Sequence, residues 1–301
     1  KPPPRPLSLK REGRRDGRTS SPDCEAAAKR TGEIKSTMGF CPLQQDNNMS
    51  DKNNMERFRT IGYKDFQRMA QDPTLSPYEK IGFPDSYRAG KEWDIWLDIQ
   101  QKMPAFGKAG ATIMDIGCGC SDLVGYLIEH THKMGQRLIL LDSAEMLALV
   151  PDAPHVVKVA GFYPHETPQL WQQYAEKVDG VLLYSVFHYT FVEDNIYQFI
   201  DRTMQLVAAG GQFLIGDIPN ASKRRRFFAT PTGVAYHQAY TQSDTLPPAH
   251  SFDLQSDQID DGVLMGIVLR YRNAGHEAYI LPQSPQLPMS NRREDLLICK
   301  W

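Results

Sequence analysis

The sequence predicts an α/β fold in which a mostly parallel sheet carries helices on both faces. Three observations support this prediction. Short apolar runs alternate with amphipathic stretches, the first two runs flank a glycine-rich turn and a helix, and two further apolar runs lie at residues 276–281 and 295–299. Strands that alternate with helices in this way are typical of parallel sheets covered by helices on either side.

Residues 111–142 organise this fold, because their pattern indicates a strand, a glycine-rich turn, a helix and a second strand. Gly117 and Gly119 allow the backbone of the turn to approach a ligand closely and to take positive φ values. The amides at the start of the following helix point to the same place. Asp142 ends the second strand, where its carboxylate can accept two hydrogen bonds from ribose hydroxyls. The pattern therefore predicts a nucleoside-binding site.

The charges around the turn distinguish between nucleoside ligands. A dinucleotide-binding turn has the pattern G-x-G-x-x-G, but Asp122 stands here at its last position, and a carboxylate there repels a pyrophosphate. Asp115, which ends the first strand, adds negative charge. S-adenosylmethionine (SAM) suits these surroundings better, because its tail carries an ammonium and its sulfur is a sulfonium. An NAD-dependent oxidoreductase is the alternative that this turn disfavours.

The run MDIGCGC, followed by LILLD, resembles the class I SAM-dependent methyltransferases, and the resemblance covers residues 108–301. It implies a seven-stranded, mostly parallel, Rossmann-like sheet whose last strand is antiparallel. It also implies SAM as the cofactor and methyl transfer as the reaction. On this resemblance the cofactor-binding residues lie in and after the first four strands, at Asp115, Gly117, Cys118, Gly119, Asp142, Ser143, Met146, Ala160, Gly161, Phe162, Tyr184 and Ser185.

His188 lies just beyond the fourth strand, at the edge of the sheet where such folds bind their ligands. Its unperturbed pKa lies near neutrality, so it is the candidate general base, and the alternative is a histidine that only holds a loop. The resemblance implies a small-molecule acceptor with an O-, N- or C-nucleophile, for example a sugar or an anionic metabolite. The candidate substrate-binding residues are Tyr87, Arg88, Asp217, Arg224 and His237.

Three segments lie outside the predicted sheet. Residues 1–48 are rich in Pro, Arg, Ser and Gly and are expected to be a disordered tail, for which an origin outside the natural protein is favoured. Residues 49–108 are expected to form a helical cap whose helix turns Trp93, Trp96 and Leu97 inward. Residues 219–255 are expected to form a loop-rich lid. The SAM-binding domain then spans residues 109–301.

Composition narrows the function further. The chain of 301 residues has a formal net charge of −2, so no global positive field argues for nucleic acid. We expect a cytoplasmic protein that binds no membrane and no metal, and a homodimer is left open. Residues 223–226 (KRRR) leave an RNA or protein methyltransferase as an alternative. A SAM-binding protein without catalytic activity is the other.

Overall fold

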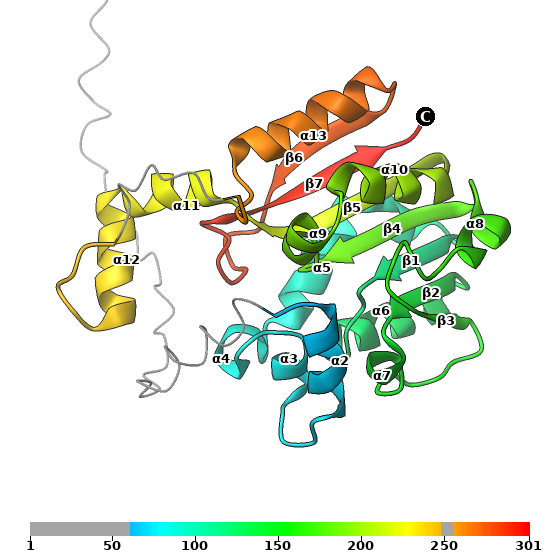
Figure 1. Cartoon of the computed structure of the whole chain (residues 1–301), viewed down its shortest axis with the longest axis horizontal. Helices are drawn as coiled ribbons and strands as arrows, with labels where there is room; N and C mark the ends of the chain where they lie inside the picture. The colour runs from blue at the N-terminus through cyan, green and yellow to red at the C-terminus, as the bar shows by residue number, and fades with distance from the viewer. Residues whose placement is uncertain (1–60, 248–255) are drawn as a thin grey trace, which may run out of the picture. The chain divides into compact units, whose positions relative to one another are not determined.

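The computed structural model of the chain describes residues 61–247 and 256–301, all of which belong to one compact unit, Asn48–Trp301. The predicted tail, residues 1–48, lies outside the described residues. Seven strands form one sheet in the order β3-β2-β1-β4-β5-β7-β6 (Figure 1). The strands are β1 (Thr112–Ile116), β2 (Arg137–Asp142), β3 (Val156–Ala160), β4 (Val178–Tyr184), β5 (Val207–Pro219), β6 (Glu277–Pro282) and β7 (Arg293–Cys299).

The sheet is parallel from β3 to β5, and β7 runs antiparallel to both of its neighbours. The chain moves outward from β1 to β3, then returns to place β4 on the other side of β1. A reversal of this kind leaves a crevice at the carboxyl ends of the central strands, where ligands bind. The predicted fold class is confirmed.

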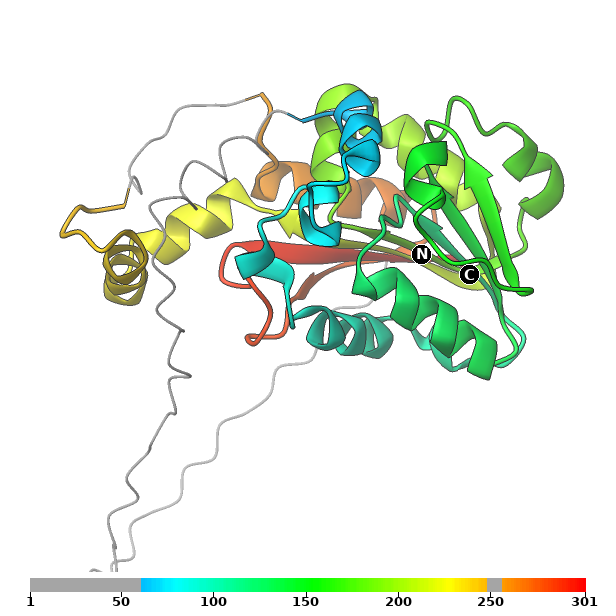
Figure 2. The same ribbon diagram turned by 90° about the horizontal axis from the view of Figure 1, so that it is seen from below.

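Helices cover both faces of this sheet (Figure 2). Alternate residues of each central strand point to opposite faces, so Ile113 joins the core beneath α5 and α6, whereas Met114 joins the core beneath α8, α9, α10 and α13. None of the helices in the described ranges is long and apolar enough to cross a membrane. The helices that flank the sheet are α5 (Glu92–Lys102), α6 (Asp122–Lys133), α7 (Ala144–Leu147), α8 (Gln169–Tyr174), α9 (Phe187–Glu193), α10 (Ile196–Leu206) and α13 (Asp261–Asn273).

Within residues 49–108, the described part of the cap contains three short helices, α2 (Tyr63–Gln71), α3 (Pro77–Lys80) and α4 (Asp85–Arg88), followed by α5. The prediction that Trp93 and Leu97 face inward was wrong, since their side chains are 51% and 39% exposed. The chain turns at Gly90, where φ is +70°, and α5 begins only at Glu92. The helix therefore presents a different face to the core, made of Ile95, Trp96 and Ile99.

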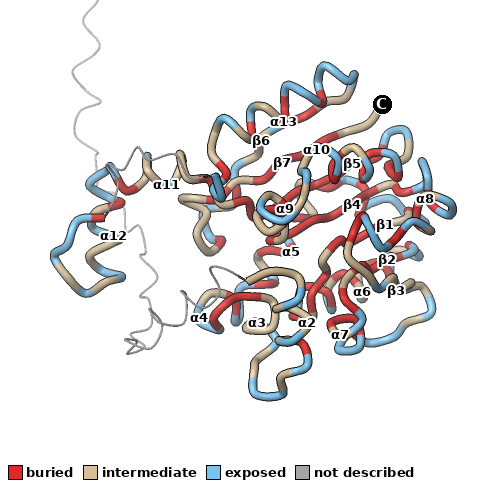
Figure 3. Tube along the Cα trace, in the orientation of Figure 1, coloured by how far each residue is buried: buried red, intermediate tan, exposed pale blue. Residues whose placement is uncertain are grey.

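The lid is more regular than the sequence predicted. Residues 219–247 contain α11 (Ala221–Phe228) and α12 (Pro231–Thr241), and residues 248–255 are outside the described part. The side chain of Asn220 caps α11 and that of Thr230 caps α12. Pro231 occupies the first turn of α12, where a proline costs no hydrogen bond, so it starts the helix. Much of α12 is exposed (Figure 3).

Candidate functional site

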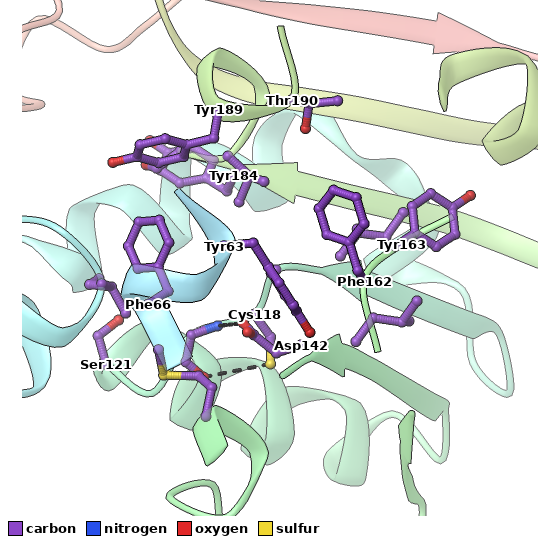
Figure 4. A pocket seen from close by; sticks show the side chains of 18 of the residues that line it. Tyr63, Phe66, Cys118, Ser121, Asp142, Phe162, Tyr163, Tyr184, Tyr189 and Thr190 are labelled. Carbon is purple, nitrogen blue, oxygen red and sulfur yellow. Dashed lines mark hydrogen bonds between the residues drawn. The ribbon is translucent and has the colours of Figure 1, made fainter. Parts of the chain in front are cut away.

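A pocket lies at the carboxyl ends of β1, β2 and β4, and residues of the cap form one of its sides. Figure 4 shows the rings of Tyr63, Phe66 and Phe162 around it. Nine of the twelve predicted cofactor-binding residues line this pocket. They are Gly117, Cys118, Gly119, Asp142, Met146, Gly161, Phe162, Tyr184 and Ser185.

The glycine turn fits tightly between β2, α9 and the cap. Gly117 donates from its amide to the carbonyl of Leu141 at 2.8 Å, and its φ is +72°. A Cβ atom at Gly117 would lie 2.7 Å from Val186 Cγ2, and one at Gly119, where φ is +63°, would lie 2.7 Å from Ile81 Cγ2. Both positions thus require glycine for conformation and for space.

Asp142 connects the end of β2 to this turn. Its Oδ2 accepts a hydrogen bond from the Gly119 amide at 2.9 Å, and its Oδ1 accepts one from the Ser143 amide at 2.7 Å. Burial raises the pKa of Asp142 to about 6, although both amides favour its charged form. A carboxylate has about four acceptor sites, so Asp142 can still accept hydrogen bonds from a ribose diol.

Aromatic and apolar side chains complete the walls beside Asp142. Tyr63 of α2 lies 4.9 Å from Phe162, measured between ring centroids, and Met146 of α7 is buried on the same pocket wall. Phe66 stands one helical turn after Tyr63 and packs edge-on against Tyr189. Sequence reasoning missed both α2 residues, and their spacing of three within a helical stretch was the available signal.

The carboxylate of Glu92 occupies the N-terminus of α6. Its Oε2 accepts a hydrogen bond from the Leu123 amide at 2.6 Å. Glu92 also lines the pocket, and burial raises its pKa, whereas Arg88 lowers it. In dinucleotide-binding folds a helix N-terminus at this place receives the pyrophosphate. Here a protein carboxylate has taken that position, and no motif in the sequence indicated it.

A buried network of charges lies behind the pocket, at the carboxyl ends of β4 and β5. Arg88 donates from Nη2 to Ser185 Oγ and, at 3.3 Å, to Asp217 Oδ2. Ser185 donates to the same oxygen of Asp217 at 2.5 Å, and Arg293 donates to it at 2.6 Å. Ser185 and Asp217 have φ values of +60° and +59°. Residues other than glycine in this region are strained, and such strain clusters at functional sites.

Comparisons with known proteins give the fold a name. No family model and no curated protein matches the chain by sequence. The plantazolicin methyltransferase BamL, solved with a triazolic desmethylPZN analog and SAH, aligns over 83% of this chain and 98% of its own, with a TM-score of 0.51 and 13% identity. The plantazolicin methyltransferase BpumL, solved with SAH, aligns over the same shares of the two chains, with a TM-score of 0.50 and 12% identity. The chain has the Rossmann-like methyltransferase fold.

Three predicted cofactor-binding residues lie off the pocket wall of this methyltransferase fold. Asp115 is buried at the end of β1, where burial and the nearby Asp142 raise its pKa to about 8. Ser143 caps α7, because its Oγ accepts a hydrogen bond from the Met146 amide. Ala160 is exposed at the end of β3. Their assignment to the cofactor stays a prediction.

His188 is the second residue of α9. At this turn the pocket is lined by Val186, Tyr189 and Thr190. The His188 ring lies 3.9 Å from the ring of Tyr189, and its Nδ1 is buried without a hydrogen-bond partner among the described residues. Burial, together with Arg293, lowers the pKa of His188 to about 3. The imidazole is therefore neutral at pH 7 and only weakly basic.

The predicted substrate-binding residues fall into two groups. Arg88 and Asp217 belong to the buried network, and Arg88 alone of the five lines the pocket. Tyr87 reaches the lid, where its hydroxyl donates to that of Tyr240 on α12 at 3.0 Å. Arg224 and His237 both lie beside the ring of Phe228 in the lid.

Two cations of the run 223–226 are paired within the fold. Lys223 donates to the Arg293 carbonyl at 2.8 Å and lies 3.8 Å from Glu294, and Arg226 pairs with Asp261. Arg225 donates to Ser222. These contacts join α11 to β7 and α13, which favours a structural role for the run over RNA binding.

Proposed function

We propose that this chain is a SAM-dependent methyltransferase that methylates a small-molecule acceptor. The observation that carries the proposal is the pairing of two carboxylates around the glycine turn. Asp142 suits a ribose diol, and Glu92 fills the helix N-terminus that a pyrophosphate needs. A nucleoside with a cationic tail fits this charge arrangement, whereas NAD does not. The SAH bound in BamL and BpumL, which share the fold, supports the same cofactor.

SAM supplies an electrophilic methyl group on its sulfonium. The chain then has to hold the adenosine, orient the tail and exclude water. Asp142, Tyr63 and Phe162 suit the first task, and the cap suits the last. Positioning of this kind can supply roughly 7–11 kcal/mol of the barrier.

The acceptor in this proposal enters between the cap and the lid, where Tyr87 meets Tyr240. Arg292 lies over both Phe228 and Tyr236 in the lid, so this region offers rings and cations together. Such a wall suits a sugar or an anionic metabolite, because rings pack on apolar faces and guanidinium groups bind anions. His188 stays our candidate for the base when the acceptor loses a proton, although it is not among the residues that line the pocket and its lowered pKa makes it a weak base.

Calorimetric titration with SAM, and with NAD as a second ligand, tests the proposal. We expect saturable binding of SAM, no binding of NAD, and loss of SAM binding in Asp142→Ala and Gly117→Asp. Gly107→Asp is the matched control, since it adds the same charge at an exposed glycine with open space around it. A folded wild-type protein that binds no SAM would refute the proposal. After SAM binding, transfer of a labelled methyl group is screened over sugars, phosphates and carboxylates.

A further inference from the structure

The cap places two opposite charges on the pocket wall, at the end of α4 and the start of α5. The side chains belong to Arg88 and Glu92, which are 3% and 2% exposed, and both line the pocket. No ion pair joins them in the part of the chain that the structure describes. Arg88 pairs with Asp217, but Glu92 has no ion-pair partner among the described residues. A buried charge without a partner is costly, so Glu92 needs a further contact.

Glu92 has one oxygen satisfied and one open. Oε2 accepts the hydrogen bond from the Leu123 amide, and the Ser121 side chain also favours the charged form of Glu92 by lowering its pKa. Oε1 is buried and accepts no hydrogen bond among the described residues. An unpaired buried acceptor carries a desolvation penalty. A ligand cation that enters this pocket would supply the missing donor.

One nitrogen of the Arg88 guanidinium makes its hydrogen bonds to the protein, and the other two nitrogens make none in the part of the chain that the structure describes. Its hydrogen bonds within the described ranges all leave from Nη2, toward Ser185 and Asp217. Its guanidinium also rests 4.1 Å from the ring centroid of Phe83. A guanidinium has five N–H donors, so Nη1 and Nε remain for an anion. Arg293 already neutralises Asp217 from the other side, which leaves positive charge at Arg88.

We propose that Glu92 and Arg88 clamp the zwitterionic methionine tail of SAM. Glu92 accepts hydrogen bonds from the tail ammonium, and Arg88 donates hydrogen bonds to the tail carboxylate. Arg88 is then a cofactor-binding residue, whereas the sequence predicted it for the substrate. The inference rests on the proposed function and deepens it, since it names the side chains that hold the tail.

The test compares three ligands that share adenosine and a thioether. They are S-adenosylhomocysteine (SAH), its deaminated analogue without the ammonium, and its decarboxylated analogue without the carboxylate. Calorimetry at pH 8 measures their dissociation constants for the wild type, Glu92→Gln and Arg88→Gln. A lost charge-assisted hydrogen bond weakens binding by about ten- to a hundredfold.

In each variant, removing one particular charged group from the ligand should no longer change the dissociation constant. We expect Glu92→Gln to weaken SAH and the decarboxylated analogue, and to leave the deaminated analogue within about twofold of the wild type. We expect Arg88→Gln to weaken SAH and the deaminated analogue, with the decarboxylated one unchanged. Glutamine at position 92 keeps a carbonyl for the Leu123 amide, so α6 stays capped.

Gln283→Leu is the control for damage to the buried network, since Gln283 carries no charge, donates to Asp217 Oδ1 at 3.3 Å and lies off the pocket wall. It should change the affinity for all three ligands by one common factor. If Arg88→Gln or Glu92→Gln does the same, or changes nothing, the clamp is refuted and the proposed function stands. If the folded wild type binds none of the three ligands, both proposals fail.

Discussion

The substitution Asp142→Asn should weaken SAM binding while it changes the stability of the ligand-free protein little. The reason is that the buried carboxylate of Asp142 binds the ribose but destabilises the folded chain. The substitution keeps the shape of the side chain and one acceptor oxygen. It replaces the other oxygen by an amide donor and removes the charge.

The structure allows the loss of SAM affinity to be estimated. A ribose diol donates two hydrogen bonds to a charged acceptor, each worth about 1.5–3 kcal/mol, and a neutral acceptor gives about 0.5–1.5 kcal/mol. The variant loses one bond and the charge on the other, or about 2.5–4.5 kcal/mol. We therefore expect SAM to bind about 70- to 2000-fold more weakly.

The stability of the ligand-free protein should change much less. Burial raises the pKa of Asp142 to about 6, about two units above its ordinary value, so ionised Asp142 costs about 3 kcal/mol at pH 8. Asparagine escapes this cost, but its amide group faces a backbone N–H, which costs about 1–3 kcal/mol. The two terms nearly cancel.

Calorimetry and thermal unfolding at pH 8 measure both quantities. Asp152→Asn is the control, since its side chain is 95% exposed and should affect neither quantity. An affinity loss below tenfold, or a variant that is unfolded without ligand, would show that Asp142 does not have the role assigned to it.

Four further predictions follow from other contacts. Gly119→Ala should lower stability more than Gly110→Ala and should also weaken SAM binding. Both glycines have positive φ, which costs alanine about 1–2 kcal/mol, but only at position 119 would the added Cβ clash with Ile81. Equal effects of the two variants in unfolding and titration would contradict this. Lys102→Met should lower the free energy of unfolding, measured with denaturant, by about 3–5 kcal/mol, because it leaves the carboxylates of Asp98 and Asp295 buried without a cation. Lys133→Met, at an exposed ion pair, should change this free energy little. Similar losses in the two variants would contradict the role of the buried ion pairs. The pKa of Asp115 is raised to about 8 in the folded protein, so Asp115 stays protonated there while it ionises in the unfolded chain, and stability falls as pH rises from about 4 to 8. Asp115→Asn should flatten the slope of stability against pH and raise the melting temperature at pH 8. An unchanged slope would exclude Asp115 as its source. If His188 is the base, His188→Asn should lower kcat about 100-fold or more and leave the affinity for SAM unchanged. Because the pKa of His188 is about 3, its protonation should cause no loss of wild-type activity near pH 6.5. A kcat of the variant within a few-fold of wild type would assign His188 a structural role.

The sheet and the centre of the pocket were predictable, because local patterns encode them. Apolar runs mark the buried strands, and Gly117 and Asp142 stand at fixed positions relative to two of these runs. Glu92 was not predictable, since no motif marks it. The spacing of Tyr63 and Phe66 indicates one face of a helix, but no local pattern shows that this face packs on the pocket.

Burial decided the remaining differences. The histidine type suggested a base near neutrality, but the pKa of His188 depends on the surrounding side chains, which only the folded chain brings together. In the lid, prolines suggested loops, although Pro231 starts a helix. Sequence gives the identity of such residues, and tertiary packing gives their effect.

The cap has a consequence for the timing of turnover. Its helix α2 is tied to the rest of the molecule by polar contacts such as Tyr63 N to Glu193 and Gln67 to Glu145, while Tyr63 and Phe66 cover the pocket. Contacts of this kind open locally without unfolding the sheet. In the proposed methyltransferase, α2 has to open to admit SAM and to release the product, and we expect its opening rate to limit kcat where methyl transfer is faster.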